Sequence, residues 1–441
     1  MIEKYLVKKI TEPVDWKVTV PGSKSMTNRA LLLAALSAGT VRVEGVLFSD
    51  DSRHFLACLV SLGFAVQIEE EKKCVTVTGC GGRIPSREAV IDVGSAGTAA
   101  RFLAAMLGFS DGCYEIRCSA QMKRRPMAEL FDRLSGAGAK ITFLEEEGHL
   151  PVRITGCRYA RADKTAGETP RELSLDITKS TQFLSALLLI APMVPEGMKI
   201  HITSEKTDGS YIRITRKMMQ EFGVSVAFDG RDYEVPCRSS YRKETYMVEP
   251  DMSAACYFYA AAAVTGGRAL VRHVHMDNTQ GDLRFLEVLE RMGCKADDTP
   301  EGVRVTGPAD GALRGITVNM NDFSDQALTL AAIAPFADAP VRIEGIGHIR
   351  GQECDRIHAI QTNLTALGIR CEEEETAATI YPGSPHGGNV ETYDDHRVAM
   401  AFSLIGLRTD GIVIENPACC RKTFEDYFTV LSELTGKKTE A

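Results

Sequence analysis

The chain has 441 residues, of which 44% are hydrophobic and 25% charged, and its formal net charge is −8. This ordinary globular composition supports two or three domains. The acidic balance disfavours nucleic-acid binding, and the apolar runs are too short to span a membrane. Its 13 cysteines form no CxxC pair and adjoin no histidine cluster, so we predict neither a metal site nor a disulfide framework.

One sequence unit recurs six times along the chain. A polar or glycine-containing start leads into a helix rich in alanine and leucine, followed by a turn and a short strand of alternating apolar residues. The copies are spaced by roughly 70 to 85 residues, which suits a small α/β unit better than a solenoid repeat. They begin at Ser23, Gly94, Asp176, Pro250, Asn321 and Asp394.

Each unit also predicts a second, amphipathic helix that ends at a glycine and runs into a strand. Glycine suits the left-handed position that follows a helix. These glycines are Gly63, Gly223, Gly293 and Gly368.

The sixth copy is incomplete, because its second helix, predicted over residues 423–434, is followed by only a few residues. Two strand-like segments, residues 5–10 and 16–20, are left over at the N-terminus, and we expect both to complete the sixth unit. This predicts one discontinuous domain of three repeats, residues 1–22 with 248–441, and an inserted domain of three repeats, residues 23–247. One large doubly wound domain is the alternative, but it explains neither the recurrence nor the truncated copy.

The six alanine-rich helices are apolar nearly all round, which predicts that they are buried, yet their starts are polar. Lysine and arginine in a first turn, as in PGSKSMTNR, oppose the helix dipole and call for an anion. Helix starts offer unpaired N–H groups to phosphate or carboxylate, so we predict an anion site in the cleft between the domains. The alternative is that the polar residues are N-caps, as for Ser253 and Asp395, and that single arginines are surface residues.

The motif PGSKSMTNRALLLAAL resembles the opening motif of the 5-enolpyruvylshikimate-3-phosphate (EPSP) synthases. Seven further motifs follow in the family's order over the whole chain: GSAGTAARF, RRPM, STQFLSALL, DQALTLAA, HIRGQECDRI, DDHRVAMAFSL and RKTFEDYF. The resemblance implies an α/β enolpyruvyl-transferase fold, an inside-out α/β barrel in which each of two domains holds three copies of a βαβαββ unit.

The resemblance also implies an activity. It is the transfer of the enolpyruvyl group of phosphoenolpyruvate to the 5-hydroxyl of shikimate 3-phosphate, with release of phosphate, through a tetrahedral intermediate. This step lies in the shikimate pathway to chorismate and the aromatic amino acids, and the enzyme is the target of glyphosate. No cofactor and no metal are implied, and we expect a cytoplasmic monomer whose partners are the two small-molecule substrates, without nucleic acid or membrane.

Residue roles carry over from the matching motifs. Three residues are implied in catalysis, with Asp325 as base for the hydroxyl, Glu353 as proton donor to the methylene carbon, and Lys24 between both substrates. The residues implied to bind shikimate 3-phosphate are Lys24, Ser25, Arg29, Ser180, Thr181, Gln182, Asp325, His348 and Gln352. Those implied to bind phosphoenolpyruvate are Lys24, Gly97, Arg125, Gln182, Arg356, Arg397 and Lys422.

Several positions depart from the family pattern. The sequence has Gln352 where a lysine is usual, so it lacks the cation that would stand beside the attacking hydroxyl. We hypothesise that His348, where asparagine is usual, supplies part of that function. The other departures are Ser95 for asparagine, Phe102 for proline, Thr181 for serine, and Asp208 for serine with Ser210 close by.

The sequence disfavours three other functions. The enolpyruvyl transferase that acts on UDP-N-acetylglucosamine opens with a Lys-Asn-Ala motif and carries a reactive cysteine in a loop before an Arg-Pro. Here the first motif is SKSMTNR, and Cys118 lies one residue further from Arg125 than that loop allows. A non-catalytic anion-binding homologue is suggested by Gln352 but disfavoured by the retained acid, base and arginines. An RNA-end-processing enzyme would require a catalytic histidine and a basic face, and neither is apparent.

Overall fold

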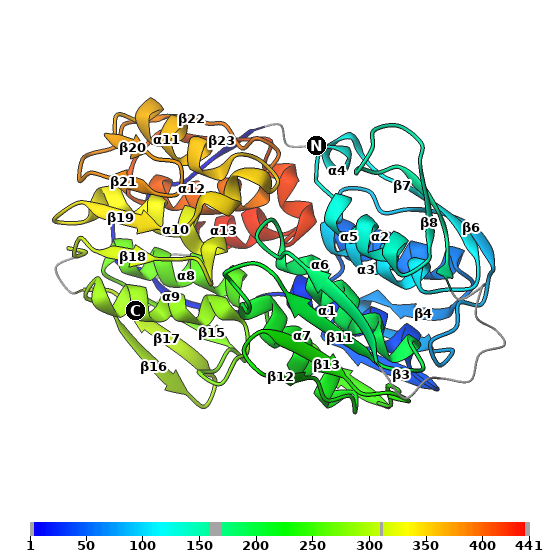
Figure 1. The fold of residues 1–441 in the computed structure, drawn as a ribbon. Helices are drawn as coiled ribbons and strands as arrows, with labels where there is room; N and C mark the ends of the chain where they lie inside the picture. Colours follow the sequence, from blue (N-terminus) through cyan, green and yellow to red (C-terminus); the bar gives the residue numbers. More distant parts are fainter. Residues whose placement is uncertain (1–3, 158–169, 309–311, 437–441) are drawn as a thin grey trace. The chain divides into compact units, whose positions relative to one another are not determined.

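The computed structural model describes residues 4–157, 170–308 and 312–436. Its contacts divide the chain into two compact units, Gly22–Glu249 and Met1–Pro21 with Pro250–Ala441. We call them the inserted unit and the terminal unit. Each has a hydrophobic core of its own (Figure 1).

Two consecutive segments of the inserted unit share the order strand, helix, strand, helix, strand, strand. In each, the first two strands are parallel and the remaining pairs antiparallel. The first segment comprises β6 (Glu88–Asp92), α3 (Gly97–Gly108), β7 (Cys113–Arg117), α5 (Ala128–Gly136), β8 (Lys140–Phe143) and β9 (Val152–Thr155), with the short α4 (Ala120–Lys123) before α5. The second comprises β10 (Arg171–Leu175), α6 (Thr181–Ile190), β11 (Met198–Ile202), α7 (Ser210–Glu221), β12 (Ala227–Phe228) and β13 (Asp232–Val235).

The remaining sheet of the inserted unit joins its two ends. Its first strand, β14 (Thr245–Met247), comes from the end of the unit and pairs in parallel with β3 (Thr40–Glu44). The other elements are α1 (Lys24–Leu36), α2 (Asp50–Ser61), β4 (Ala65–Glu69) and β5 (Cys74–Thr78).

The terminal unit holds three related segments, two with all six elements of this order and one whose sheet has three strands. One copy comprises β18 (Thr317–Asn319), α10 (Ala327–Ile333), β19 (Val341–Glu344), α11 (Arg356–Ala366), β20 (Cys371–Glu373) and β21 (Ala378–Ile380). A second comprises β2 (Asp15–Val18), α8 (Met252–Thr265), β15 (Arg268–Arg272), α9 (Phe285–Arg291), β16 (Lys295–Thr299) and β17 (Gly302–Thr306). The last comprises β22 (Gly388–Val390), α12 (His396–Arg408), β23 (Ile412–Glu415), α13 (Tyr427–Gly436) and β1 (Lys4–Leu6).

The two N-terminal strands serve different sheets, which corrects one prediction. β1 pairs with β23 and completes the sixth copy, as expected. β2 instead pairs in parallel with β15 and provides the first strand of the fourth copy. The reason is that β14, which precedes α8 in the chain, pairs with β3 in the inserted unit, so the fourth copy needs a first strand from elsewhere.

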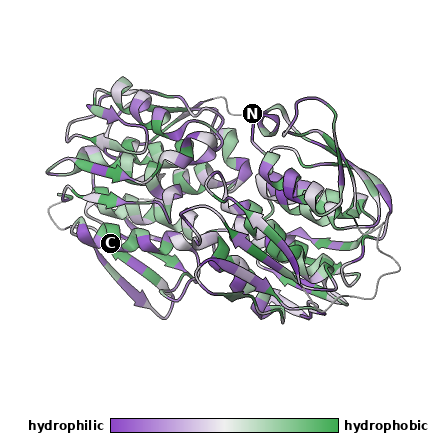
Figure 2. Ribbon diagram, in the orientation of Figure 1, coloured by the Kyte–Doolittle hydropathy of each residue, from purple (hydrophilic) through white to green (hydrophobic). Residues whose placement is uncertain are grey.

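Three central helices in each unit pack on one another: α1, α3 and α6 in one, and α8, α10 and α12 in the other. All twelve residues of α3 are buried, as are nearly all those of α1 and α12. The sheets contribute one apolar face each, and Figure 2 shows β17 with hydrophobic and hydrophilic residues in alternation. The predicted burial of the alanine-rich helices is therefore confirmed.

The glycines predicted to follow the second helices all have left-handed backbone, with φ between +83° and +104°. At Gly63 a side chain would also meet Ser86 Oγ at 2.7 Å, so this position excludes a Cβ on two grounds.

Packing in α2 yields a matched stability prediction. Leu56 is 2% exposed and Val60 is 54% exposed on the same helix. Leu56→Ala is expected to lower the free energy of unfolding by about 2–5 kcal/mol, because it leaves a cavity in a close-packed core. Val60→Ala is expected to change it by roughly 0.5 kcal/mol or less. Urea unfolding measures both, and equal losses would contradict the packing described.

Candidate functional site

The starts of the three central helices of the terminal unit are joined through side chains. Arg397, in the first turn of α12, donates from Nη2 to Asp325 Oδ2 at 2.9 Å and to Ser253 Oγ at 3.4 Å. Asp325 lies in the 3₁₀ turn η5 (Ser324–Gln326) that leads into α10, and Ser253 lies in the first turn of α8. Polar groups from three repeats therefore converge on one place.

Arg356, the first residue of α11, lies at the centre of this arrangement and is 1% exposed. Its nitrogens donate to Asp325 Oδ1 at 3.0 Å, Glu353 Oε2 at 3.0 Å and Asp395 Oδ2 at 2.8 Å. Burial opposes its charge, but Asp395, Glu353 and Asp325 outweigh that effect and raise the pKa of Arg356 above its usual value. The guanidinium is therefore a permanent cation shared among three carboxylates.

Two more predicted residues complete this group. Lys422, at the end of η8 (Pro417–Lys422), places Nζ 3.3 Å from Glu353 Oε1. Gln352 Oε1 accepts a hydrogen bond from Arg356 Nη1. We define the terminal cluster as the bonded groups of Ser253, Asp282, Asp325, Gln352, Glu353, Arg356, Asp395, Arg397 and Lys422.

His348 lies in η7 (Gly347–Gly351), and its Nε2 is 2.8 Å from Ser324 Oγ. Ser324 directly precedes Asp325, so the imidazole contacts the turn that carries the predicted base. A contribution of His348 to proton transfer stays a prediction.

The inserted unit presents its cations differently. Arg29 is 1% exposed and donates to Thr215 Oγ1 at 2.8 Å, to the Ser25 carbonyl at 2.8 Å and to the Tyr211 carbonyl at 3.2 Å. Its guanidinium also lies 5.2 Å from the centre of the Phe102 ring. No carboxylate bonds Arg29 among the described residues, and burial lowers the pKa of Arg29 to about 10.

Arg125 lies beside the start of α3. A Cβ built on Gly97 would lie 2.5 Å from Arg125 Nη1 and 2.8 Å from Arg101 Nη1. The N-terminal residue of the helix is Gly97 itself, and no side chain caps it. Arg125 Nε is buried without a hydrogen-bond partner in the described part of the chain. A cation and uncapped N–H groups therefore face the same space, which suits an anion.

The remaining predicted residues of the inserted unit lie at the starts of α1 and α6. Lys24 Nζ is 3.5 Å from Asp51 Oδ2, and Ser25, half-buried, follows it in α1. Ser180 is the N-cap of α6 and accepts from the Gln182 N–H at 3.2 Å. Gln182 Oε1 is buried without a partner among the described residues, which leaves an acceptor for a ligand donor. Thr181 is the first residue of that helix.

The two units thus differ in how they satisfy their cations. In the terminal cluster, carboxylates bond Arg356, Arg397 and Lys422. In the inserted unit, Arg29 and Arg125 have no carboxylate partner among the residues that the structure describes. Because a buried cation without a counter-charge is costly, the inserted unit favours an incoming anion more strongly.

Comparison with known proteins agrees with this geometry. The family model EPSP synthase (3-phosphoshikimate 1-carboxyvinyltransferase) matches residues 8–431. The 3-phosphoshikimate 1-carboxyvinyltransferase of Trichormus variabilis is 41% identical over 429 residues, which is 97% of this chain and 98% of that one. The chain belongs to the EPSP synthase family. The enzyme of the same name from Sulfurovum sp. is 40% identical and covers 96% of this chain and 97% of its own.

Solved structures confirm the predicted enolpyruvyl-transferase fold. An EPSP synthase from Acinetobacter baumannii matches with a TM-score of 0.78 and 25% identity over 98% of this chain and 97% of that one. The enolpyruvyl transferase NikO from Streptomyces tendae matches with a TM-score of 0.73 at 16% identity, over 98% and 97% of the two chains, and shows the fold alone. The family predicted from the motifs is likewise confirmed.

Sequence reasoning missed four side chains beside the predicted EPSP synthase residues. Asp51 contacts Lys24, and Arg101 lies one helical turn after Gly97 with Nη1 3.2 Å from the Gly97 carbonyl. Asp395 does cap α12, as the cap interpretation held, but it also bonds Arg356. Asp282, discussed below, carried no signal beyond an acidic residue before a helix. Of these, Arg101 carried a signal in the sequence, because a residue four positions after Gly97 lies on the same face of the helix.

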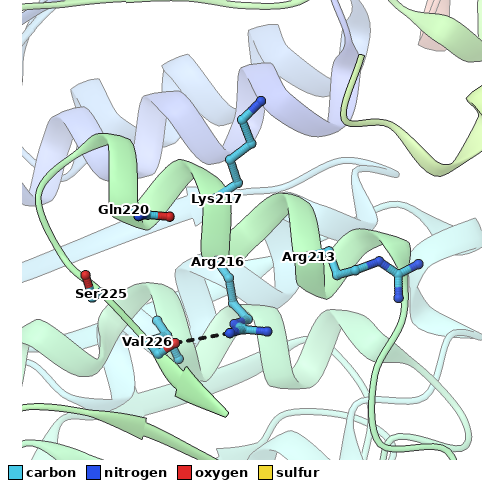
Figure 3. A pocket seen from close by; sticks show the side chains of 6 residues that line it. All are labelled: Arg213, Arg216, Lys217, Gln220, Ser225 and Val226. Atoms are coloured by element: carbon cyan, nitrogen blue, oxygen red, sulfur yellow. Dashed lines mark hydrogen bonds between the residues drawn. The ribbon is translucent and has the colours of Figure 1, made fainter. Parts of the chain in front are cut away.

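A hollow of about 310 Å³ on α7 is a separate feature, lined by Arg213, Arg216, Lys217, Gln220, Ser225 and Val226. Its cations are engaged in other contacts, since Arg213 pairs with Asp208 at 3.0 Å and Lys217 with Glu249 at 3.6 Å. Figure 3 shows Arg213 and Lys217 pointing in different directions. The hollow is therefore unlike the convergent helix starts. Asp208 accepts from this arginine and from the Tyr233 hydroxyl, while Ser210 begins α7.

The described residues lack two kinds of feature. They contain no group of three or more His, Cys, Asp and Glu side chains arranged to hold a metal ion. None of the described helices has the length and apolar character needed to cross a membrane.

Arg29 generates a prediction that separates stability from ligand binding. Arg29→Met removes a buried charge that no carboxylate compensates, while the methionine fills most of the space. We expect the free energy of unfolding to stay within about 1 kcal/mol of the parent value or to rise. Thermal unfolding with and without shikimate 3-phosphate should show that the stabilisation by this ligand is lost. Severe destabilisation without ligand would show that the arginine serves the fold.

Proposed function

We propose that this chain transfers the enolpyruvyl group of phosphoenolpyruvate to the 5-hydroxyl of shikimate 3-phosphate and releases phosphate. One observation carries the proposal: two carboxylates, Asp325 and Glu353, share one buried guanidinium, that of Arg356. An acid and a base held by the same cation suit a reaction that adds a proton at one atom and removes one at another. Membership of the EPSP synthase family supports the choice of substrates.

The donor needs several cations, because phosphoenolpyruvate carries a phosphate and a carboxylate. Arginine forks match both groups in a bidentate manner. We assign it to residues of both units: Lys24, Gly97, Arg125, Gln182, Arg356, Arg397 and Lys422. Binding in the terminal cluster requires the donor to compete with Asp325 and Glu353 for Arg356 and Arg397, which would free both carboxylates to act on the substrates.

The acceptor carries a phosphate, a carboxylate and the attacking hydroxyl. We assign its 3-phosphate to the start of α6 at Ser180, Thr181 and Gln182, where helix N–H groups suit an anion. Arg29 and Ser25 take the carboxylate side, with Lys24 between both substrates. Asp325 faces the 5-hydroxyl, with Gln352 and His348 near the same turn.

The chemistry is an addition followed by an elimination. Glu353 gives a proton to the methylene carbon of phosphoenolpyruvate. Asp325 takes the proton of the 5-hydroxyl while the hydroxyl oxygen forms a bond to the central carbon of phosphoenolpyruvate. In the elimination, Glu353 takes back a proton from the new methyl group of the tetrahedral intermediate as the bond to phosphate breaks, which leaves the enol ether. Cations around the departing phosphate stabilise its charge.

The alternatives are weaker. A UDP-N-acetylglucosamine enolpyruvyl transferase is not favoured by the family model or by the relatives' names. A non-catalytic anion-binding protein does not account for two carboxylates held by one arginine. We further propose that the protein acts as a monomer in the cytoplasm, with the two substrates as its partners.

Turnover with defined variants tests the function. Phosphate release from phosphoenolpyruvate should require shikimate 3-phosphate. Asp325→Asn and Glu353→Gln should each lower kcat by roughly 10²–10⁴-fold, as expected for general acid–base groups, while both substrates still bind. Glu287→Gln, a change at an exposed side chain of α9, is the control. Phosphate release independent of the acceptor would refute the function, whereas near-normal turnover of one variant would refute only that residue's role.

Gly97 yields a prediction about inhibition. Glyphosate should compete with phosphoenolpyruvate, and Gly97→Ala should weaken the inhibitor with some loss of donor affinity. The reason is that the new methyl group would lie 2.5 Å from Arg125 Nη1 and displace that cation. Gly136→Ala is the matched control, because its Cβ meets nothing within 4 Å. An inhibition constant that Gly97→Ala leaves unchanged would show that this glycine does not line the donor site.

A further inference from the structure

Asp282 is a buried carboxylic acid that the motifs do not assign. It lies in the 3₁₀ turn η4 (Gly281–Arg284), directly before α9, and is 6% exposed. A carboxyl group at this depth is costly unless hydrogen bonds hold it. Its partners therefore indicate why the protein keeps it there.

Two residues in the described structure donate hydrogen bonds to the Asp282 side chain, and they lie at the starts of the central helices α8 and α10. Ser253 Oγ, in the first turn of α8, donates to Oδ2, and Gln326 Nε2 donates to the same oxygen at 3.0 Å. Gln326 is fully buried, and its Oε1 accepts from Thr329 Oγ1 at 2.9 Å. The amide therefore has a single orientation, with its nitrogen toward Asp282.

These two partners connect Asp282 to Asp325 by separate routes. Gln326 directly follows Asp325 in the chain, so the hydrogen bond that holds Gln326 also fixes the 3₁₀ turn that carries Asp325. Ser253 uses its proton on Asp282 and its lone pair on Arg397 Nη2 at 3.4 Å, and Arg397 in turn donates to Asp325 Oδ2 at 2.9 Å. Both the backbone and the hydrogen-bond partner of Asp325 thus depend on one carboxylate.

The charge of Asp282 also acts on Asp325 directly. Burial, and then repulsion from Asp325, raise the pKa of Asp282 to about 6. The charged or titratable groups facing it in the described structure are Asp325 on η5, Arg397 on α12 and Cys256 on α8. Cys256 Sγ donates to the Asp282 carbonyl at 3.7 Å, and burial raises its pKa, so it stays a thiol. Protonation of Asp282 would weaken the bonds that its carboxylate receives from Ser253 and Gln326, so the support of the Asp325 turn depends on an ionised Asp282.

We propose that Asp282 is a positioning residue for the reaction: through its hydrogen bonds with Gln326 and Ser253, the carboxylate sets the place of Asp325 and Arg397. This inference rests on the proposed function, in which Asp325 takes the proton of the hydroxyl. Asp282 itself touches neither the substrates nor the reacting atoms.

Asp282→Asn tests the proposal, with kcat and kcat/KM measured across pH by phosphate release. The amide removes the charge, while its carbonyl oxygen can still accept the two bonds that Oδ2 receives. We expect kcat on the plateau to fall on the order of ten- to a hundredfold, the effect typical of replacing two hydrogen bonds to a charged group by weaker neutral ones. Because the variant has no carboxyl group at position 282 to take up a proton near pH 6, the acidic limb of kcat/KM should also move to lower pH.

A purely structural role would lower the plateau at every pH and leave the acidic limb in place, and that result would overturn the proposal. A plateau within twofold of the parent would overturn it equally. Asp282→Glu keeps the charge and the acceptor. Its acidic limb of kcat/KM should stay at the parental pH even if its plateau kcat differs. A shift of that limb would also contradict the proposal.

Two further variants keep the test decisive. Asp297→Asn makes the same change at an exposed position of β16 in the same unit and should match the parent. Should Asp282→Asn not fold, Ser253→Ala removes only the route through Arg397 and should lower kcat, and parental kcat in that variant would sink the idea. Inactivity of the parent chain with both substrates would instead count against the proposed function, so the two failures are distinguishable.

Discussion

The terminal unit is organised around the burial of the Arg356 guanidinium. A cation that is 1% exposed would cost several kcal/mol of stability without partners. Asp325, Glu353 and Asp395 supply them, one from the turn before α10, one from the loop before α11, and one from the N-cap of α12. Folding of this unit therefore brings together Asp325 and Glu353, the two carboxylates to which we assign the chemistry.

The same pairing makes ligand binding in the terminal cluster an exchange. An anionic ligand gains contact with Arg356 and Arg397 only as carboxylates give up theirs, so part of its binding free energy is offset. Arg29 of the inserted unit sets no such competition, because it bonds hydroxyls and carbonyls. An anion at Arg29 would replace neutral partners, whereas Lys24 of the same unit lies beside Asp51. Under the proposed function, Arg29 would thus be pre-organised for binding, while binding at Arg356 would release the proposed acid and base.

The sequence predicted features that depend on local chemistry. Buried alanine-rich helices and left-handed glycines such as Gly63 follow from periodicity and backbone sterics, and both are present. The sheet assignment of β2 was wrong because strand pairing is long-range and either of two incomplete sheets would accept a leftover strand. Asp282 was missed for a similar reason, since its partners Ser253 and Gln326 lie 29 and 44 residues away.

Gln352 shows how one substitution acts through the whole cluster. The usual lysine would add a fourth cation beside Arg356, Arg397 and Lys422, facing the four carboxyl groups of Asp325, Glu353, Asp395 and Asp282. Glutamine instead accepts a hydrogen bond from Arg356 and leaves the bonded groups with one more acid than base. A buried network with an uncompensated negative charge takes up a proton most readily at the acid that lacks a direct ion pair. Asp282 is that acid, because its bonds come from a hydroxyl and an amide, and this agrees with its raised pKa of about 6.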